Sequence, residues 1–120
     1  MKYITLIIGL LVAAGCSKSL TEEEKKVVGS YETKKDGNTF RKVYLGNGVV
    51  ESYENGKKYE EDKWSISKEG EIHIKYVDGT PYTGIIRINT DKSITDFAFI
   101  IGGKRTDFPK KGQKTYKKIK

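Results

Sequence analysis

The sequence predicts an all-β protein: an antiparallel, up-and-down meander of about eight or nine short strands that closes into a small barrel. Glycine beside Asn or Asp recurs along the chain, and such pairs accept the positive φ of tight turns. Between them lie short segments rich in Val, Ile, Thr, Tyr and Phe, without a long helical period. The turn signals are Asp36-Gly37, Asn47-Gly48, Asn55-Gly56, Glu69-Gly70, Asp78-Gly79, Asp91-Lys92, Gly102-Gly103 and Lys111-Gly112.

Each segment between two turn signals is expected to be one strand. Connections of about two to five residues favour sequential hairpins, and closing the meander into a barrel removes the exposed edges of the sheet. Residues 27–120 are long enough for one small domain, whose last strand is basic. The expected strands are 27–33, 39–45, 49–54, 57–67, 71–77, 82–89, 93–101, 104–108 and 114–119.

Strand alternation assigns the faces of individual strands. Ile72, Ile74 and Tyr76 share one face of the fifth segment, so they are expected to point inward while His73 faces water. In the segment 95–101, Phe97, Phe99 and Ile101 share one face, but the opposite face is apolar too. We therefore expect that strand to be covered on both sides.

A short helix is expected before the first strand. Thr21 is a suitable N-cap, and Glu24 stands in the position that completes a capping box. The residues around this helix are mostly polar and charged, so we interpret residues 16–26 as a polar tether.

The start of the chain has the composition of an export signal. Lys2 precedes a mostly apolar run over residues 3–12, which is shorter than the about 20 residues that a membrane-spanning helix needs. Small residues follow this run and lead directly to the only cysteine of the chain. The segment Ala13-Ala14-Gly15-Cys16 resembles the bacterial lipobox, although Ala13 stands where that family most often has Leu.

The lipobox resemblance implies cleavage between Gly15 and Cys16 and attachment of lipid to Cys16. Residues 1–15 are then a lipoprotein signal peptide, and the chain is anchored to a membrane of the bacterial cell envelope. Ser17 stands where Asp would resemble an inner-membrane retention signal, which favours the outer membrane if the host has two. Export also argues against nucleic acid as a partner.

Two short motifs resemble those of lipocalins and related calycins. Gly29-Ser30-Tyr31 is similar to their Gly-x-Trp start, with Tyr in place of Trp, and Thr95-Asp96-Phe97 resembles their later Thr-Asp-Tyr element. The resemblance implies a cup for an apolar small molecule. The alternative is that the same side chains fill the barrel, because about eight strands enclose little more space than side chains occupy. The candidate residues for lining a ligand cup or a filled core are Tyr31, Trp64, Ile72, Ile74, Tyr76, Phe97 and Phe99.

Positive charge is concentrated at the end of the chain. The formal net charge is +7, and residues 104–120 hold eight Lys or Arg against the single acidic Asp107. One interpretation is contact with an anionic envelope polymer or lipid through Lys110, Lys111, Lys114 and Lys117. The other is a terminal edge strand whose lysines discourage pairing with a second sheet.

The sequence contains no catalytic constellation. His73 is the only histidine, and it has neither a cysteine partner in the barrel domain nor a second histidine for a shared metal. The acidic groups Glu60-Glu61-Asp62 and Glu69 with Glu71 lie in highly charged segments next to turns, which is typical of solvated surface. We therefore expect no enzyme, cofactor or metal, and the sequence predicts no oligomeric state.

Three function classes remain open from the sequence: an envelope binding protein with a barrel cup, a lipoprotein that contacts another protein or the wall, and an orphan structural domain. A binding protein predicts a cavity with one open mouth, whereas an interaction or inhibitor protein predicts a filled core and recognition by loops or by the basic tail. The loops to compare are residues 55–58 and 78–82.

Overall fold

A computed structural model describes residues 20–120 of the chain. In that part it contains nine strands and two short helices, and the predicted all-β meander is confirmed. The predicted signal segment 1–15, its cleavage at Gly15 and Cys16, and residues 16–19 of the tether lie outside the described residues. The elements are α2 (Glu22–Val27), β1 (Gly29–Lys35), β2 (Asn38–Tyr44), β3 (Val49–Glu54), β4 (Lys57–Ile66), β5 (Ile72–Lys75), β6 (Tyr82–Ile88), β7 (Ile94–Ile101), β8 (Lys104–Asp107), η1 (Lys110–Gly112) and β9 (Thr115–Lys118).

The predicted capping box sets the start of α2. The Glu24 amide donates to the Thr21 hydroxyl at 3.1 Å, and the Thr21 amide donates to the Glu24 carboxylate at 2.8 Å. The helix continues through Val27, so the prediction that the first strand begins at Val27 is wrong. The strand begins two residues later, at Gly29.

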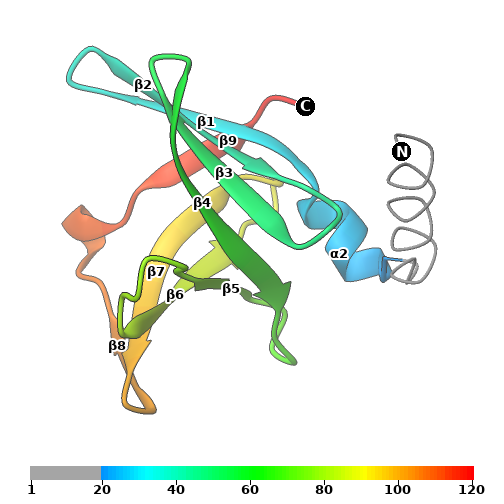
Figure 1. Cartoon of the computed structure of the whole chain (residues 1–120), viewed down its shortest axis with the longest axis vertical. Coiled ribbons are helices and arrows are strands. Elements are labelled where there is room, and N and C mark those ends of the chain that lie inside the picture. Colours follow the sequence, from blue (N-terminus) through cyan, green and yellow to red (C-terminus); the bar gives the residue numbers. More distant parts are fainter. Residues whose placement is uncertain (1–19) are drawn as a thin grey trace, which may run out of the picture.

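Eight of the nine strands of residues 20–120 close into a barrel, as predicted. Strands β1 to β7 pair in chain order, and β9 closes the ring by pairing with both β1 and β7. β8 stays outside the ring and pairs with the last residues of β7 (Figure 1). The barrel wall is therefore completed by a short strand that runs beside only the first residues of β7.

The wall contains an irregularity between β6 and β7. Asp96 pairs with Ile86 while Ala98 pairs with Ile85, which leaves Phe97 as the extra residue of a β-bulge. The bulge breaks the alternation that the sequence suggests for β7. The prediction that Phe97 shares a face with Phe99 is therefore wrong.

The core lies at the α2 end of the barrel. Val27 from the helix is fully buried, and the hydroxyl of Tyr31 donates to its carbonyl oxygen at 2.6 Å. Tyr44 stacks edge to face between Tyr31 and Trp64. The buried cluster consists of Val27, Tyr31, Tyr44, Val50, Trp64, Ile72, Ile74, Ile86, Ile94 and Tyr116.

The β1–β2 and β3–β4 hairpins project beyond the barrel on the side away from α2 (Figure 1). Asn55, in the β3–β4 turn, links the two hairpins by side-chain hydrogen bonds. Its side-chain oxygen accepts from the Thr39 amide at 2.9 Å, and its side-chain nitrogen donates to Asn38 at 2.9 Å. The two hairpins thus extend the barrel wall beyond the ring of paired strands.

No helix within residues 20–120 has the length and apolar character needed to cross a membrane.

Candidate functional site

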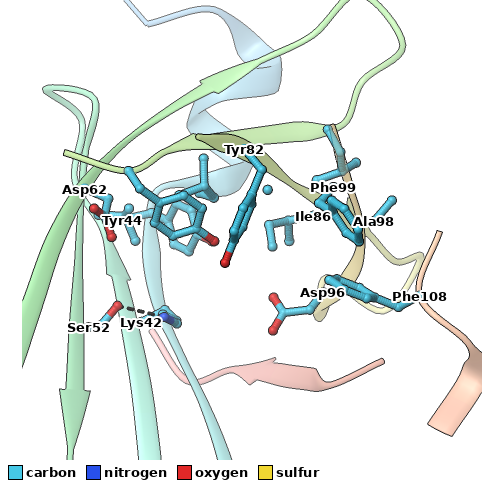
Figure 2. A pocket seen from close by; sticks show the side chains of 15 residues that line it. Lys42, Tyr44, Ser52, Asp62, Tyr82, Ile86, Asp96, Ala98, Phe99 and Phe108 are labelled. Carbon is cyan, nitrogen blue, oxygen red and sulfur yellow. Dashed lines mark hydrogen bonds between the residues drawn. The ribbon is translucent and has the colours of Figure 1, made fainter. Parts of the chain in front are cut away.

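A cavity of about 130 Å³ lies inside the barrel between β2–β4 and β5–β7. The side chains that line it are aromatic, aliphatic and charged, so this is not a purely apolar cup (Figure 2). The lining residues are Lys42, Tyr44, Val50, Ser52, Asp62, Ile74, Tyr76, Tyr82, Gly84, Ile85, Ile86, Asp96, Ala98, Phe99 and Phe108.

The predicted lining residues separate into three groups. Ile74, Tyr76 and Phe99 do line the cavity. Tyr31, Trp64 and Ile72 are instead part of the buried apolar cluster and are absent from the cavity lining. Phe97 belongs to neither set, because its ring stacks with the guanidinium of Arg87, whose carbon lies 3.6 Å from the ring centroid. The bulge in β7 explains this last difference.

Lys42 brings a positive charge into the cavity from β2. Its ammonium donates to the hydroxyl of Ser52 on β3 at 2.7 Å. Burial lowers the pKa of Lys42, and the negative charges of Asp96, Glu60 and Asp62 limit the fall. An ammonium has three N–H donors, so Lys42 keeps capacity for further acceptors in the cavity.

Asp96 brings a negative charge to the other side of the cavity. Figure 2 shows its carboxylate and the Tyr82 hydroxyl directed toward the middle of the cavity, with Lys42 and Ser52 across from them. Burial raises the pKa of Asp96, and the positive charges of Lys42 and Lys114 oppose that rise. Within residues 20–120, the carboxylate makes neither a hydrogen bond nor an ion pair.

A second pair of acidic groups lies on β4. Asp62 is only 3% exposed, and its carboxylate accepts from the Val77 amide at 3.1 Å. Glu60 is the next inward-facing residue along the strand. The hydrogen bond that protonated Glu60 makes with Asp62, together with burial, raises the pKa of Glu60 to about 7. This carboxyl therefore titrates near neutral pH.

Aromatic rings lead from the cavity to its rim. Tyr76 and Tyr82 have ring centroids 5.4 Å apart, Tyr82 and Phe99 5.7 Å, and Phe99 and Phe108 5.4 Å. Tyr82 is 39% exposed, so this row of rings reaches the solvent. Gly84 leaves space for the Tyr76 side chain in this row, because a Cβ at position 84 would lie 2.9 Å from the Tyr76 hydroxyl oxygen.

The four predicted lysines of the C-terminal segment differ in their exposure to solvent. Lys114 is half-buried, and its Nζ lies 4.9 Å from the centre of the Phe40 ring. Its charge also acts on Lys42 and Asp96 at the cavity. Lys110 and Lys111 are exposed on η1, and Lys117 is exposed on β9.

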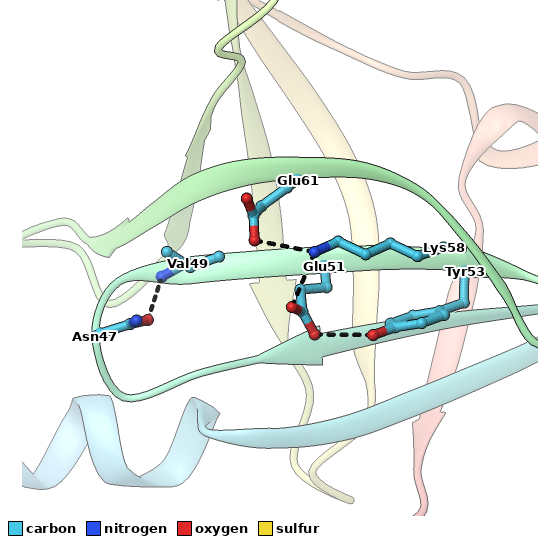
Figure 3. Close-up of polar contacts among 6 residues, drawn as sticks. All are labelled: Asn47, Val49, Glu51, Tyr53, Lys58 and Glu61. Carbon is cyan, nitrogen blue, oxygen red and sulfur yellow. Dashed lines mark hydrogen bonds and ion pairs between the residues drawn. The ribbon is translucent and has the colours of Figure 1, made fainter. Parts of the chain in front are cut away.

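The outer face of β3 and β4 carries charged groups that are already paired (Figure 3). Lys58 lies 3.1 Å from both Glu51 and Glu61, and the Tyr53 hydroxyl donates to Glu51 at 3.0 Å. The hydrogen bonds from Lys58 and Tyr53 lower the pKa of Glu51. These side chains use one another as hydrogen-bond and charge partners on the surface, which is typical of a stabilising network rather than a binding site.

Other acidic residues near turns also have partners. Glu71 forms a two-bond ion pair with Arg105, at 2.9 and 3.0 Å. His73 pairs with Ser65 and Ile85 in the wall and does not line the cavity. No group of three or more His, Cys, Asp or Glu side chains in the described part of the chain is arranged to hold a metal ion.

Sequence reasoning did not single out Lys42, Ser52 or Asp96 as site residues. The signal was nevertheless present, since Lys42 shares a strand face with Tyr44, and Ser52 shares one with Val50. A charged or hydroxyl residue on an inward face marks a polar interior.

Comparison of the chain with models of protein families, with curated proteins and with solved structures gives no match.

Proposed function

We propose that this protein is a non-enzymatic binding protein of the bacterial cell envelope, anchored by lipid on Cys16, that holds a small molecule in the barrel cavity. The anchor rests on the lipobox resemblance of Ala13-Ala14-Gly15-Cys16. The binding role rests on the cavity, in which Lys42 and Asp96 are desolvated and keep unused hydrogen-bonding capacity. Both side chains are half-buried, so their free hydrogen-bonding positions face the cavity, where ordered water or a ligand can satisfy them.

The lining favours a polar ligand over the apolar one that the lipocalin resemblance implies. A fatty or aromatic hydrocarbon would cover Lys42 and Asp96 without replacing their lost hydration, which is costly. An engineered cavity of about 150 Å³ takes up benzene, which gives a scale for the cavity of about 130 Å³ found here. The enclosed part of the ligand is therefore only a few heavy atoms long.

The position of the mouth fits an anchored binding protein. The chain reaches the barrel through α2, which lies on the opposite side of the molecule from β8 (Figure 1). Phe108 follows β8 directly and lines the cavity. Lipid attached before α2 would thus leave the rim around Phe108 and Tyr82 facing away from the membrane.

The test is a fragment screen of the full-length protein in detergent, with compounds of about six to ten heavy atoms. Trp64 is the only tryptophan, and its ring centroid lies 5.8 Å from that of the cavity residue Tyr44, so its fluorescence reports occupancy. We expect hits that shift this fluorescence and are weakened by Tyr82→Ala. The matched control is Tyr53→Ala, because Tyr53 lies on the outer face of β3. A screen without cavity hits would contradict the proposal.

A second role is contact with an anionic envelope polymer or lipid surface. The observation that favours it is the exposure of Lys110 and Lys111 together on η1. Lys110→Glu with Lys111→Glu is expected to weaken salt-sensitive binding to anionic vesicles. The matched control is Lys34→Glu with Lys35→Glu, which reverses two exposed charges at the far end of β1. Equal loss in both pairs would show that only net charge matters.

A further inference from the structure

We propose that the ligand is a small zwitterion, whose carboxylate binds at Lys42 and whose ammonium binds at Asp96. This inference rests on the proposed binding function and names the ligand class of the same cavity. The carrying observation is that one cavity presents a cation, Lys42 on β2, across from a carboxylate, Asp96 on β7, that makes no hydrogen bond within residues 20–120. The third charged group of the lining, Asp62, already accepts from the Val77 amide. Neither Lys42 nor Asp96 is neutralised by an ion pair in that part of the chain.

The Lys42 side of the cavity is suited to a carboxylate. Ser52 accepts one N–H of the ammonium at 2.7 Å and leaves two for a ligand. Lys114, held 4.9 Å from the centre of the Phe40 ring, adds a second positive charge that acts on both Lys42 and Asp96. A ligand carboxylate would restore the stabilisation of the charged ammonium that burial removes.

The Asp96 side of the cavity is suited to an ammonium group. Its carboxylate is directed into the cavity and can accept several N–H bonds. The hydroxyl of Tyr82 points toward the same space and supplies a further acceptor. Asp62, the other carboxylate of the lining, already accepts from the Val77 amide and is 3% exposed, which leaves Asp96 as the better partner.

The pairing of Lys42 and of Asp96 with a ligand selects a zwitterion over an ion of one sign. A simple anion would pair with Lys42 but would leave Asp96 desolvated beside a second negative charge, and a simple cation would do the reverse at Lys42. A zwitterion pairs both groups at once. The cavity of about 130 Å³ accepts the two charged ends and a short side chain, which corresponds to a small α-amino acid.

The experiment compares four probes on the full-length protein in detergent by calorimetry and by amide NMR shifts. L-valine and D-valine carry both charges, 3-methylbutanoate lacks the ammonium, and 2-methylpropylamine lacks the carboxylate. We expect one of the valine enantiomers to bind at least about tenfold more tightly than either single-charge analogue. This comparison needs no variant, so it does not depend on how a substitution affects folding.

Variants then assign each charge to its partner. Asp96→Asn should weaken valine binding about tenfold without weakening 3-methylbutanoate binding, because that probe has no ammonium to lose and no longer faces a negative charge at position 96. Lys42→Met should also weaken valine binding about tenfold, without weakening 2-methylpropylamine binding, because that probe has no carboxylate to lose. The controls are Asp36→Asn and Lys117→Met, which make the same changes at exposed positions.

The outcomes separate this inference from the proposed function. Binding of either single-charge analogue as tight as that of valine would overturn the zwitterion and leave a small-molecule site in place. Failure of all four probes, with cavity hits from the fragment screen, would likewise overturn the ligand class alone. Failure of the probes and of the screen would overturn both, and would mean that water satisfies Lys42 and Asp96.

Discussion

Lys42 on β2 and Asp96 on β7 line one cavity, and burial shifts their pKa values in opposite directions, downward for the ammonium and upward for the carboxyl. Each charge limits the shift of the other. A buried base with a lowered pKa binds fewer protons in the native state than in the unfolded state, so its contribution to stability grows as pH rises toward 10.5. A buried acid with a raised pKa makes stability fall as pH rises above 3.8.

Lys42→Met should raise the pKa of Asp96 further, because the largest favourable charge beside the carboxylate is removed. The measurement is a carbon-13 NMR titration of the Asp96 side-chain carboxyl. Lys117→Met is the matched control, since Lys117 is exposed on the outside of β9. An unchanged Asp96 titration in Lys42→Met would show that the two groups do not interact across the cavity.

Stability should fall as pH rises from about 4.5 to about 7, because the pKa of Glu60 is raised from 4.5 to about 7 in the folded protein. The native state holds a proton in this window that the unfolded state has lost. Solvent screening of this partly buried group reduces the fall in unfolding free energy to about 1 kcal/mol.

Glu60→Gln should flatten that part of the pH profile, as measured by urea unfolding at a series of pH values. Glu69→Gln replaces an exposed glutamate in a turn and serves as the control. If the Glu60→Gln profile keeps the full slope of the unsubstituted protein, another group is responsible for it.

Gly29→Ala should destabilise the barrel by about 1–3 kcal/mol, the usual range for overpacking. Gly29 has φ +147°, and a Cβ there would lie 2.3 Å from the carbonyl oxygen of Lys120. That oxygen also accepts from the Ser30 amide at 3.1 Å, so it is not free to move away.

Gly37→Ala separates the contact from the backbone effect. Gly37 also has positive φ, at +80°, but a Cβ there would meet nothing within 4 Å. Thermal unfolding should therefore show the larger loss for Gly29→Ala. Equal losses would mean that the close approach to Lys120 relaxes without cost.

Tyr31→Phe should cost about 1 kcal/mol, because the buried hydroxyl donates to Val27 at 2.6 Å and its removal leaves that carbonyl without its partner. The loss should appear as faster amide exchange in α2 and as a lower urea midpoint. Tyr53→Phe removes a hydroxyl from the outer face of β3 and should have less effect. Unchanged exchange in α2 would show that Val27 alone anchors the helix.

The alternation of residues was sufficient to predict most of the wall. Ile72 and Ile74 are buried on the expected face of β5, and glycines at 37, 48, 56, 70 and 79 do have positive φ. Turn chemistry is local, since it depends on which residues accept a given φ. The capping box of Thr21 and Glu24 could be predicted for the same reason.

The site was harder to predict because it depends on contacts between distant strands. A single-residue bulge moved Phe97 away from the face of Phe99, and nothing in the local sequence marks where β6 and β7 change register. Lys42 and Asp96 are 54 positions apart in the chain and line one cavity only because the barrel closes. The local sequences of β2 and β7 do not predict that these two strands line the same cavity.

The sequence by itself determined the strands, the turns, the helix cap and the approximate core, because each follows from the φ preferences and polarity of neighbouring residues. Only the tertiary structure decided that the interior holds a cavity rather than a filled core, and that this cavity is charged. Ring closure through β9 sets which side chains face one another, and burial then shifts the pKa values of Lys42 and Asp96. Both effects arise from distance and desolvation, which a linear pattern does not encode.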